Sequence, residues 1–123
     1  MSNDVTELLS EVDRLLASEL EDLPPAWARA AVFLLRQALE SRLASVWHAR
    51  GLPELADASF SAQLTCLREF TSDEALVEDV TYTWHSLSAA CHHRGYGMPP
   101  SRGSLAKARR DVGRLVDGFR AHA

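Results

Sequence analysis

TSDEALVEDVTYTWHSLSAACHHR (residues 71–94) is the stretch that decides the fold class of this chain. Thr71 and Glu74 stand three residues apart, which is the spacing of a capping box and marks the start of a helix. At 100° per residue, one side of that helix carries an apolar stripe made of Leu76, Val80, Trp84, Leu87 and Cys91. We therefore expect one long helix with this stripe buried, ending at Gly95 and followed by a loop rich in glycine and proline.

Four other segments show the same helical periodicity, and no segment shows the period-two alternation of a β-strand. They are residues 4–23, residues 25–50, residues 59–70 and a last segment from about residue 104 to the end. Pro24 and Pro25 separate the first two, because proline does not continue a helix but is favoured in its first turn. Arg36 and Glu40 flank the apolar stripe of residues 25–50, which predicts a partly buried salt bridge. We expect an all-α fold: one domain, residues 1–123, built as an antiparallel up-and-down bundle of about five helices.

The chain is charge-polarised from end to end. Residues 1–25 contain seven acids and one base, whereas residues 94–123 contain seven bases and two acids, within a net charge of -4. Two interpretations remain open. The first and last helices attract each other, within one chain or across a dimer, or the basic end forms a surface for a partner such as RNA.

The sequence predicts a cytoplasmic protein that does not enter the membrane. The longest uncharged apolar run, residues 30–35, is far shorter than the ~20 residues of a spanning helix. Met1 is followed by neither the basic start nor the apolar block of a signal peptide. Cys66 and Cys91 fall inside helical patterns and are expected to be small buried apolar residues in a reducing compartment.

Histidines near the end of the central stretch are the candidates for chemistry. His85 and His92 are seven residues apart, about 10.5 Å along a helix, so they do not share a metal ion. We therefore expect no metal and no cofactor. Metal-independent RNA cleavage needs an imidazole that moves the 2′-hydroxyl proton and a cation that stabilises the developing charge of the phosphorane. His92 or His93 could supply the imidazole, and Arg94 the cation. The alternative is that these histidines cap the last carbonyl groups of the helix.

LLRQALE (residues 34–40) and WHSLSAACHH (residues 84–93) resemble segments of HEPN-superfamily domains. The resemblance spans about residues 27–119 and implies a bundle of four or five helices, frequently a homodimer. It also implies a role in RNA cleavage, RNA binding, toxin–antitoxin pairs or phage defence. Active members carry the motif R-x(4–6)-H, and in this chain no arginine stands at that distance before His92 or His93.

Three functional hypotheses follow. The first is a non-catalytic or weakly catalytic HEPN-like bundle that binds RNA or a protein partner, with nucleic acid contacted by Arg102, Lys107, Arg110, Arg114 and Tyr96. The second is a metal-independent ribonuclease toxin that uses His92, His93 and Arg94. The third is an adaptor that docks on an operon-encoded protein through the acidic first helix.

Overall fold

The computed structural model describes residues 5–19, 23–91 and 100–120 of the chain. These residues form six helices and no strand, which confirms the all-α fold. The helices are α1 (Val5–Leu16), α2 (Pro25–Ala49), α3 (Pro53–Ala56), α4 (Phe60–Phe70), α5 (Glu74–Cys91) and α6 (Arg102–Arg120). The expected number of about five becomes six in the described part, because Pro53–Ala56 folds into a short helix of its own.

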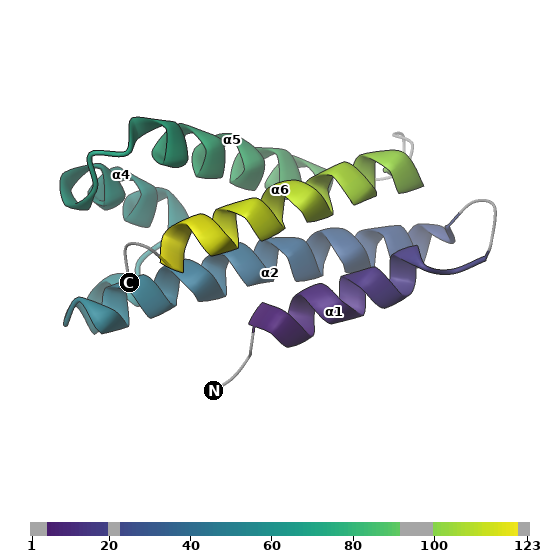
Figure 1. Ribbon diagram of the computed structural model, residues 1–123, viewed down its shortest axis with the longest axis horizontal. Helices are drawn as coiled ribbons and strands as arrows, with labels where there is room; N and C mark the ends of the chain where they lie inside the picture. Colours follow the sequence, from purple (N-terminus) through teal and green to yellow (C-terminus); the bar gives the residue numbers. More distant parts are fainter. Residues whose placement is uncertain (1–4, 20–22, 92–99, 121–123) are drawn as a thin grey trace.

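The four long helices run up and down, each antiparallel to the long helix before it (Figure 1). Helix α2 lies at the centre and packs against α1, α5 and α6. The short helices α3 and α4 connect the end of α2 to the start of α5 at one end of the bundle. The helices that hold the candidate site residues are therefore all fixed against one central element.

Helix α2 is central because its apolar side chains repeat at helical spacing over 25 residues. The stripe expected from the sequence is fully buried: Val32, Leu35, Leu39, Leu43 and Val46. Trp47 is also completely buried, and its indole Nε1 donates a hydrogen bond to Gln63 Oε1 at 2.9 Å. Gln63 Nε2 in turn donates to the Ala58 carbonyl at 2.9 Å, which ties the α3–α4 turn to the end of α2.

Helix α5 begins at Glu74 with Asp73 as its cap. The Asp73 carboxylate accepts a hydrogen bond from the Leu76 amide at 3.0 Å, and Thr71 Oγ1 accepts one from the Asp73 amide at 3.1 Å. The capping box expected from Thr71 and Glu74 is therefore wrong. Asp73 stands directly before the first turn and satisfies a free amide there in place of Thr71.

The apolar stripe of α5 is buried at Leu76, Val80 and Leu87, whereas Trp84 is only half-buried. Trp84 stacks on Phe60 of α4 with ring centroids 5.0 Å apart, and its Nε1 donates to Glu40 Oε2 at 3.1 Å. Glu40 also pairs with Arg36 at 3.2 Å, as expected of a partly buried salt bridge. One carboxylate thus joins α2 to α5. Cys66 and Cys91 are likewise half-buried and pack against the core.

Helix α1 ends at Leu16, earlier than the expected residue 23. Its last carbonyl, that of Leu16, accepts a hydrogen bond of 2.6 Å from Arg102 at the start of α6. Arg109 of α6 forms two further bonds to the Asp13 carboxylate, at 2.8 and 3.2 Å. The acidic first helix and the basic last helix therefore attract each other within one chain, which was one of the two interpretations of the charge pattern.

Candidate interaction surfaces

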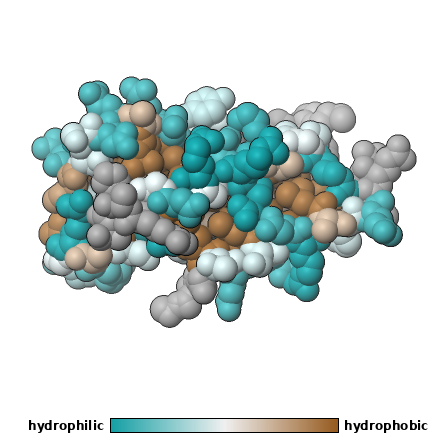
Figure 2. All heavy atoms as spheres, viewed as in Figure 1, coloured by the Kyte–Doolittle hydropathy of each residue, from teal (hydrophilic) through white to brown (hydrophobic). Residues whose placement is uncertain are grey.

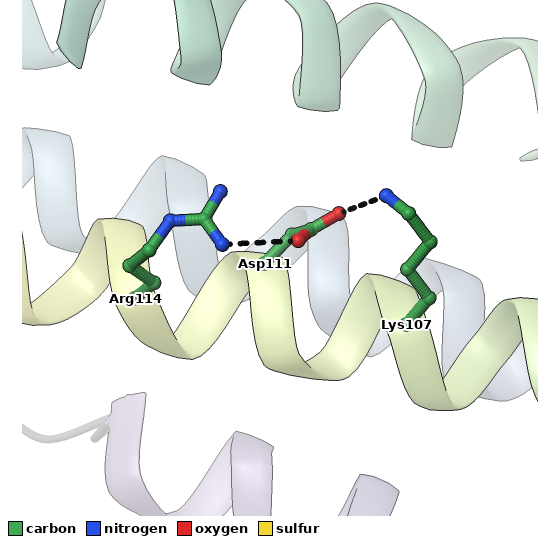
Figure 3. A network of polar contacts seen from close by, with 3 residues as sticks. All are labelled: Lys107, Asp111 and Arg114. Atoms are coloured by element: carbon green, nitrogen blue, oxygen red, sulfur yellow. Dashed lines mark hydrogen bonds and ion pairs between the residues drawn. The ribbon is translucent and has the colours of Figure 1, made fainter.

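Two of the basic residues expected to contact RNA are paired on α6 itself (Figure 3). Lys107 Nζ lies 2.8 Å from one carboxylate oxygen of Asp111, and Arg114 Nη1 lies 3.2 Å from the other. Burial raises the pKa of Asp111, but the hydrogen bonds and charges of Lys107 and Arg114 outweigh it and hold that pKa below its ordinary value. The two cations share one side of α6, as expected, but an anion lies between them.

Other arginines of α6 differ in whether they contact the rest of the chain. Arg102 and Arg109 point toward α1, where they bind the Leu16 carbonyl and the Asp13 carboxylate. Arg110 is exposed to solvent. Four cations of α6, Arg102, Lys107, Arg109 and Arg114, therefore contact an acceptor of the same chain, which reduces the positive potential that α6 offers to a phosphate backbone.

A groove of about 320 Å³ lies between α5 and α6. Its walls are mostly small or apolar, and Lys107 and Asp111 line it from the α6 side. Tyr82 lines it from α5 and is 74% exposed. The other residues around it are Val32, Thr83, Ser86, Leu87, Ala90, Pro100, Ser104, Leu105 and Ala108. The volume of the groove is at the small end of the range of small-molecule pockets, and its two charged side chains, Lys107 and Asp111, already pair with each other.

The residues proposed for RNA cleavage, His92, His93 and Arg94, lie outside the described residues, as does Tyr96. Their roles therefore stay predictions from the sequence. His85 is described, and it is exposed on α5 beside a shallow depression of about 210 Å³ that Arg68 of α4 also lines. Arg68 was not predicted from the sequence, because it belongs to another helix and no spacing links it to His85.

Within the described ranges, no group of three or more histidine, cysteine, aspartate or glutamate side chains lies close enough to hold a metal ion. The same part of the chain contains no helix that is both long and apolar enough to cross a membrane.

The surface that sequence analysis missed altogether lies on α2. We call it the α2 outer face, and it consists of Ala26, Ala30, Phe33, Gln37, Ser41, Ala44 and His48. At 100° per residue these positions fall within an arc of roughly 80°. Five of them are exposed and two, Ser41 and Ala44, are half-buried. The face carries no aspartate, glutamate, lysine or arginine, because the four such residues of α2 lie outside its arc.

Phe33 is the most prominent residue of this face, with 54% of its surface exposed. Trp27, six residues before it along α2, is 39% exposed. Hydrophilic groups cover much of the molecule in the view of Figure 2. The α2 outer face is thus an uncharged strip over the length of the helix with a protruding phenylalanine, whereas on α5 only the second half is uncharged, around the exposed Tyr82. The signal was present in the sequence as the spacing of its alanines and serines, on the side opposite the buried stripe.

Comparison of the chain with protein-family models, with curated proteins and with solved structures finds no match.

Proposed function

We propose that this chain acts by binding another protein chain rather than by catalysis, as a small HEPN-like helical interaction module. The proposal keeps the partner-binding half of the first hypothesis drawn from the sequence. The all-helical bundle with its central α2 is compatible with the HEPN-like resemblance, and a toxin–antitoxin or phage-defence setting remains part of the proposal.

The distribution of charge favours protein over RNA as the partner. RNA binding draws most of its free energy from lysines and arginines that displace counterions from phosphates. On α6 those side chains contact Asp111, Asp13 and the Leu16 carbonyl instead. Side chains that already bond to acceptors of their own chain gain less from contact with a polyanion.

The α2 outer face is the observation that carries the proposal. Charged residues are depleted and aromatic residues enriched at the centres of protein interfaces, and this face has that composition around Phe33. Because α2 is held by three other helices, the face is rigid, so little conformational entropy is lost on binding.

The decisive experiment places a charge on this face. The purified full chain and its Phe33→Glu variant are compared for self-association in solution and for retention of proteins from cells that express the chain, with and without ribonuclease. Tyr82→Glu is the matched control, because it changes another exposed aromatic residue, on α5.

We expect Phe33→Glu to lose protein binding of either kind and Tyr82→Glu to keep it, with no effect of ribonuclease. Binding that is unchanged in Phe33→Glu, or that disappears when RNA is digested, would contradict the proposal. Circular dichroism of each variant confirms that the exposed substitution leaves the helices intact.

A further inference from the structure

Thr83 of α5 is a buried residue with a hydroxyl group that lacks a partner in the described part of the chain. The residue is 8% exposed and lines the groove between α5 and α6. Thr65 and Thr81 donate their hydroxyls to the carbonyl four residues earlier, at 3.2 and 2.7 Å. Among the described residues, the Thr83 hydroxyl forms no such bond and no other hydrogen bond. Because a buried polar group without a hydrogen bond costs free energy, this hydroxyl calls for a partner inside the groove.

The groove around this hydroxyl has apolar walls and an aromatic edge. Val32 of α2, Leu87 of α5 and Leu105 of α6 are buried and line it. Tyr82 also lines it and is mostly exposed, so its ring can pack against a molecule that enters. Apolar walls that hold a ligand, with a few polar groups that orient it, are the composition of a small-molecule site.

The charges of the groove favour a neutral occupant. Lys107 and Asp111 are the charged residues that line it, and they pair with each other at 2.8 Å. The second oxygen of Asp111 is bonded to Arg114 at 3.2 Å. A charged ligand would therefore compete with an existing ion pair while losing its own hydration against apolar walls. A neutral ligand meets neither cost.

We propose that this groove binds a neutral aromatic molecule of roughly one or two rings with one hydrogen-bonding group, of the phenol or indole type. That group pairs with Thr83 Oγ1, which is able to donate and to accept, and the ring packs against Tyr82 and Leu87. The volume of about 320 Å³ suits a molecule of this size. The site shares no residue with the α2 outer face and does not depend on the proposed protein-binding function.

The first test compares phenol with toluene, which has the same shape but no hydroxyl. In NMR titrations of the isotope-labelled full chain, we expect phenol to bind with a dissociation constant of about 1 mM or lower and to shift the amide signals of the groove. Thr83→Val keeps the side-chain shape and removes the hydroxyl. It should weaken phenol by about 5- to 10-fold and leave toluene unchanged.

Two outcomes of this test would overturn the inference. The first is no saturable binding of phenol up to about 10 mM, which would mean that the hydroxyl is only hydrated. The second is an equal response of phenol and toluene to Thr83→Val. The melting temperature of Thr83→Val gives a further check: it should be equal to or above that of the wild type, and a clear decrease would mean that the hydroxyl has its partner within the fold.

The second test fills the groove. Ala108→Leu on α6 and Ser86→Leu on α5 both add volume to its walls and should abolish the binding of phenol and toluene alike. Tyr82→Ala should weaken both ligands by about 3-fold or more, because the ring contact does not involve the hydroxyl. Ala62→Leu, at an exposed position of α4, is the matched control and should leave binding unchanged. Circular dichroism verifies that each variant is folded, and binding that persists in both filling variants would place the ligand elsewhere.

The failure of this inference is distinguishable from that of the proposed function. Phe33→Glu should leave phenol binding unchanged, and Thr83→Val should leave protein binding unchanged. Loss of phenol binding in Phe33→Glu would contradict a site in the α5–α6 groove without bearing on the retention of proteins.

Discussion

Trp47 and Gln63 show how much of this fold depends on one buried polar contact. The indole of Trp47 is fully enclosed, and its donor is satisfied by the Gln63 carboxamide oxygen at 2.9 Å. The same carboxamide donates to the Ala58 carbonyl, so a buried glutamine connects α2, α4 and the turn between α3 and α4. An unpaired buried donor costs more free energy than the net gain from a formed hydrogen bond, so removal of one partner has a large effect.

We expect Gln63→Leu to lower the free energy of unfolding by about 1–3 kcal/mol, because it leaves the Trp47 N–H and a backbone carbonyl without partners. Urea denaturation of the purified chain measures the loss. Trp47→Phe and the double variant complete a cycle, in which the double variant should lose less than the sum of the two single ones. Strict additivity would mean that the two side chains do not stabilise the fold through their shared hydrogen bond.

Asp111 gives the chain a pH-dependent contribution of known sign. Although burial acts to raise it, the pKa of Asp111 is lowered from its ordinary 3.8 by Lys107 and Arg114. A carboxylate whose pKa is lower in the folded state stabilises the fold above its unfolded pKa, and that contribution disappears as the pH falls through the folded pKa.

Asp111→Asn should therefore lower the unfolding free energy at pH 7 by at most about 1 kcal/mol, since both ion pairs are open to solvent on the cation side. Below the folded pKa of Asp111 the variant and the wild type should have the same stability. Urea titrations at neutral and acid pH measure the difference, and Asp57→Asn, at an exposed position, is the control. A difference that grows on acidification would contradict the direction of the pKa shift.

At the scale of the helices, the start of α5 depends on Asp73. Its carboxylate accepts the Leu76 amide, and its own amide is held by Thr71 Oγ1. We expect Asp73→Ala to cost about 0.5–2 kcal/mol, the range for loss of an N-terminal cap. Ser72→Ala, at the exposed position between the two capping residues, should change the stability little. Urea denaturation followed by circular dichroism compares the two, and equal losses would mean that Asp73 does not cap the helix.

The sequence predicted those elements whose pattern is local. The buried stripes of α2 and α6 follow from apolar residues at helical spacing, and the structure buries Leu39 and Val112 as that spacing requires. The pairing of Arg36 with Glu40 was predicted for the same reason, because four residues separate the two on one helix.

The end of α1 was not predicted, because the Leu16 carbonyl is bound by Arg102, which is 86 residues away in sequence. The pairing of Arg109 with Asp13 over 96 residues was equally out of reach of spacing rules. The neutralisation of Lys107 and Arg114 by Asp111 was within reach, since they lie four and three residues from it on one helix. The cations of α6 had been grouped by the side of the helix on which they lie, without the aspartate among them.

At the scale of the whole molecule, the opposite charges of the two ends of the chain meet in the folded protein. Arg109 joins α6 to α1 through Asp13, and Arg102 binds the last turn of α1. The polarity that suggested a basic surface for RNA thus serves, at these residues, to hold the first and last helices together. The α2 outer face is outward-facing and uncharged, on the helix that the other three long helices surround in part.

The pairing of α6 cations within the chain predicts that these side chains contribute little to the affinity for RNA. Neutralisation of Lys107, Arg110 and Arg114 to glutamine should leave the affinity for a fluorescent single-stranded RNA nearly unchanged, because Lys107 and Arg114 are already bonded to Asp111. If all three side chains contacted phosphate, their loss would instead reduce the magnitude of the slope of log affinity against log salt concentration by about 2, at ~0.7 per contact. Fluorescence anisotropy over a series of salt concentrations measures this slope.

The matched variant is Asp111→Asn, which removes the anion between the two cations and should increase both affinity and slope. A slope smaller by about 2 in the triple variant, with no increase of slope or affinity in Asp111→Asn, would show that the cations contact phosphate despite their pairing. RNA would then be the partner of α6.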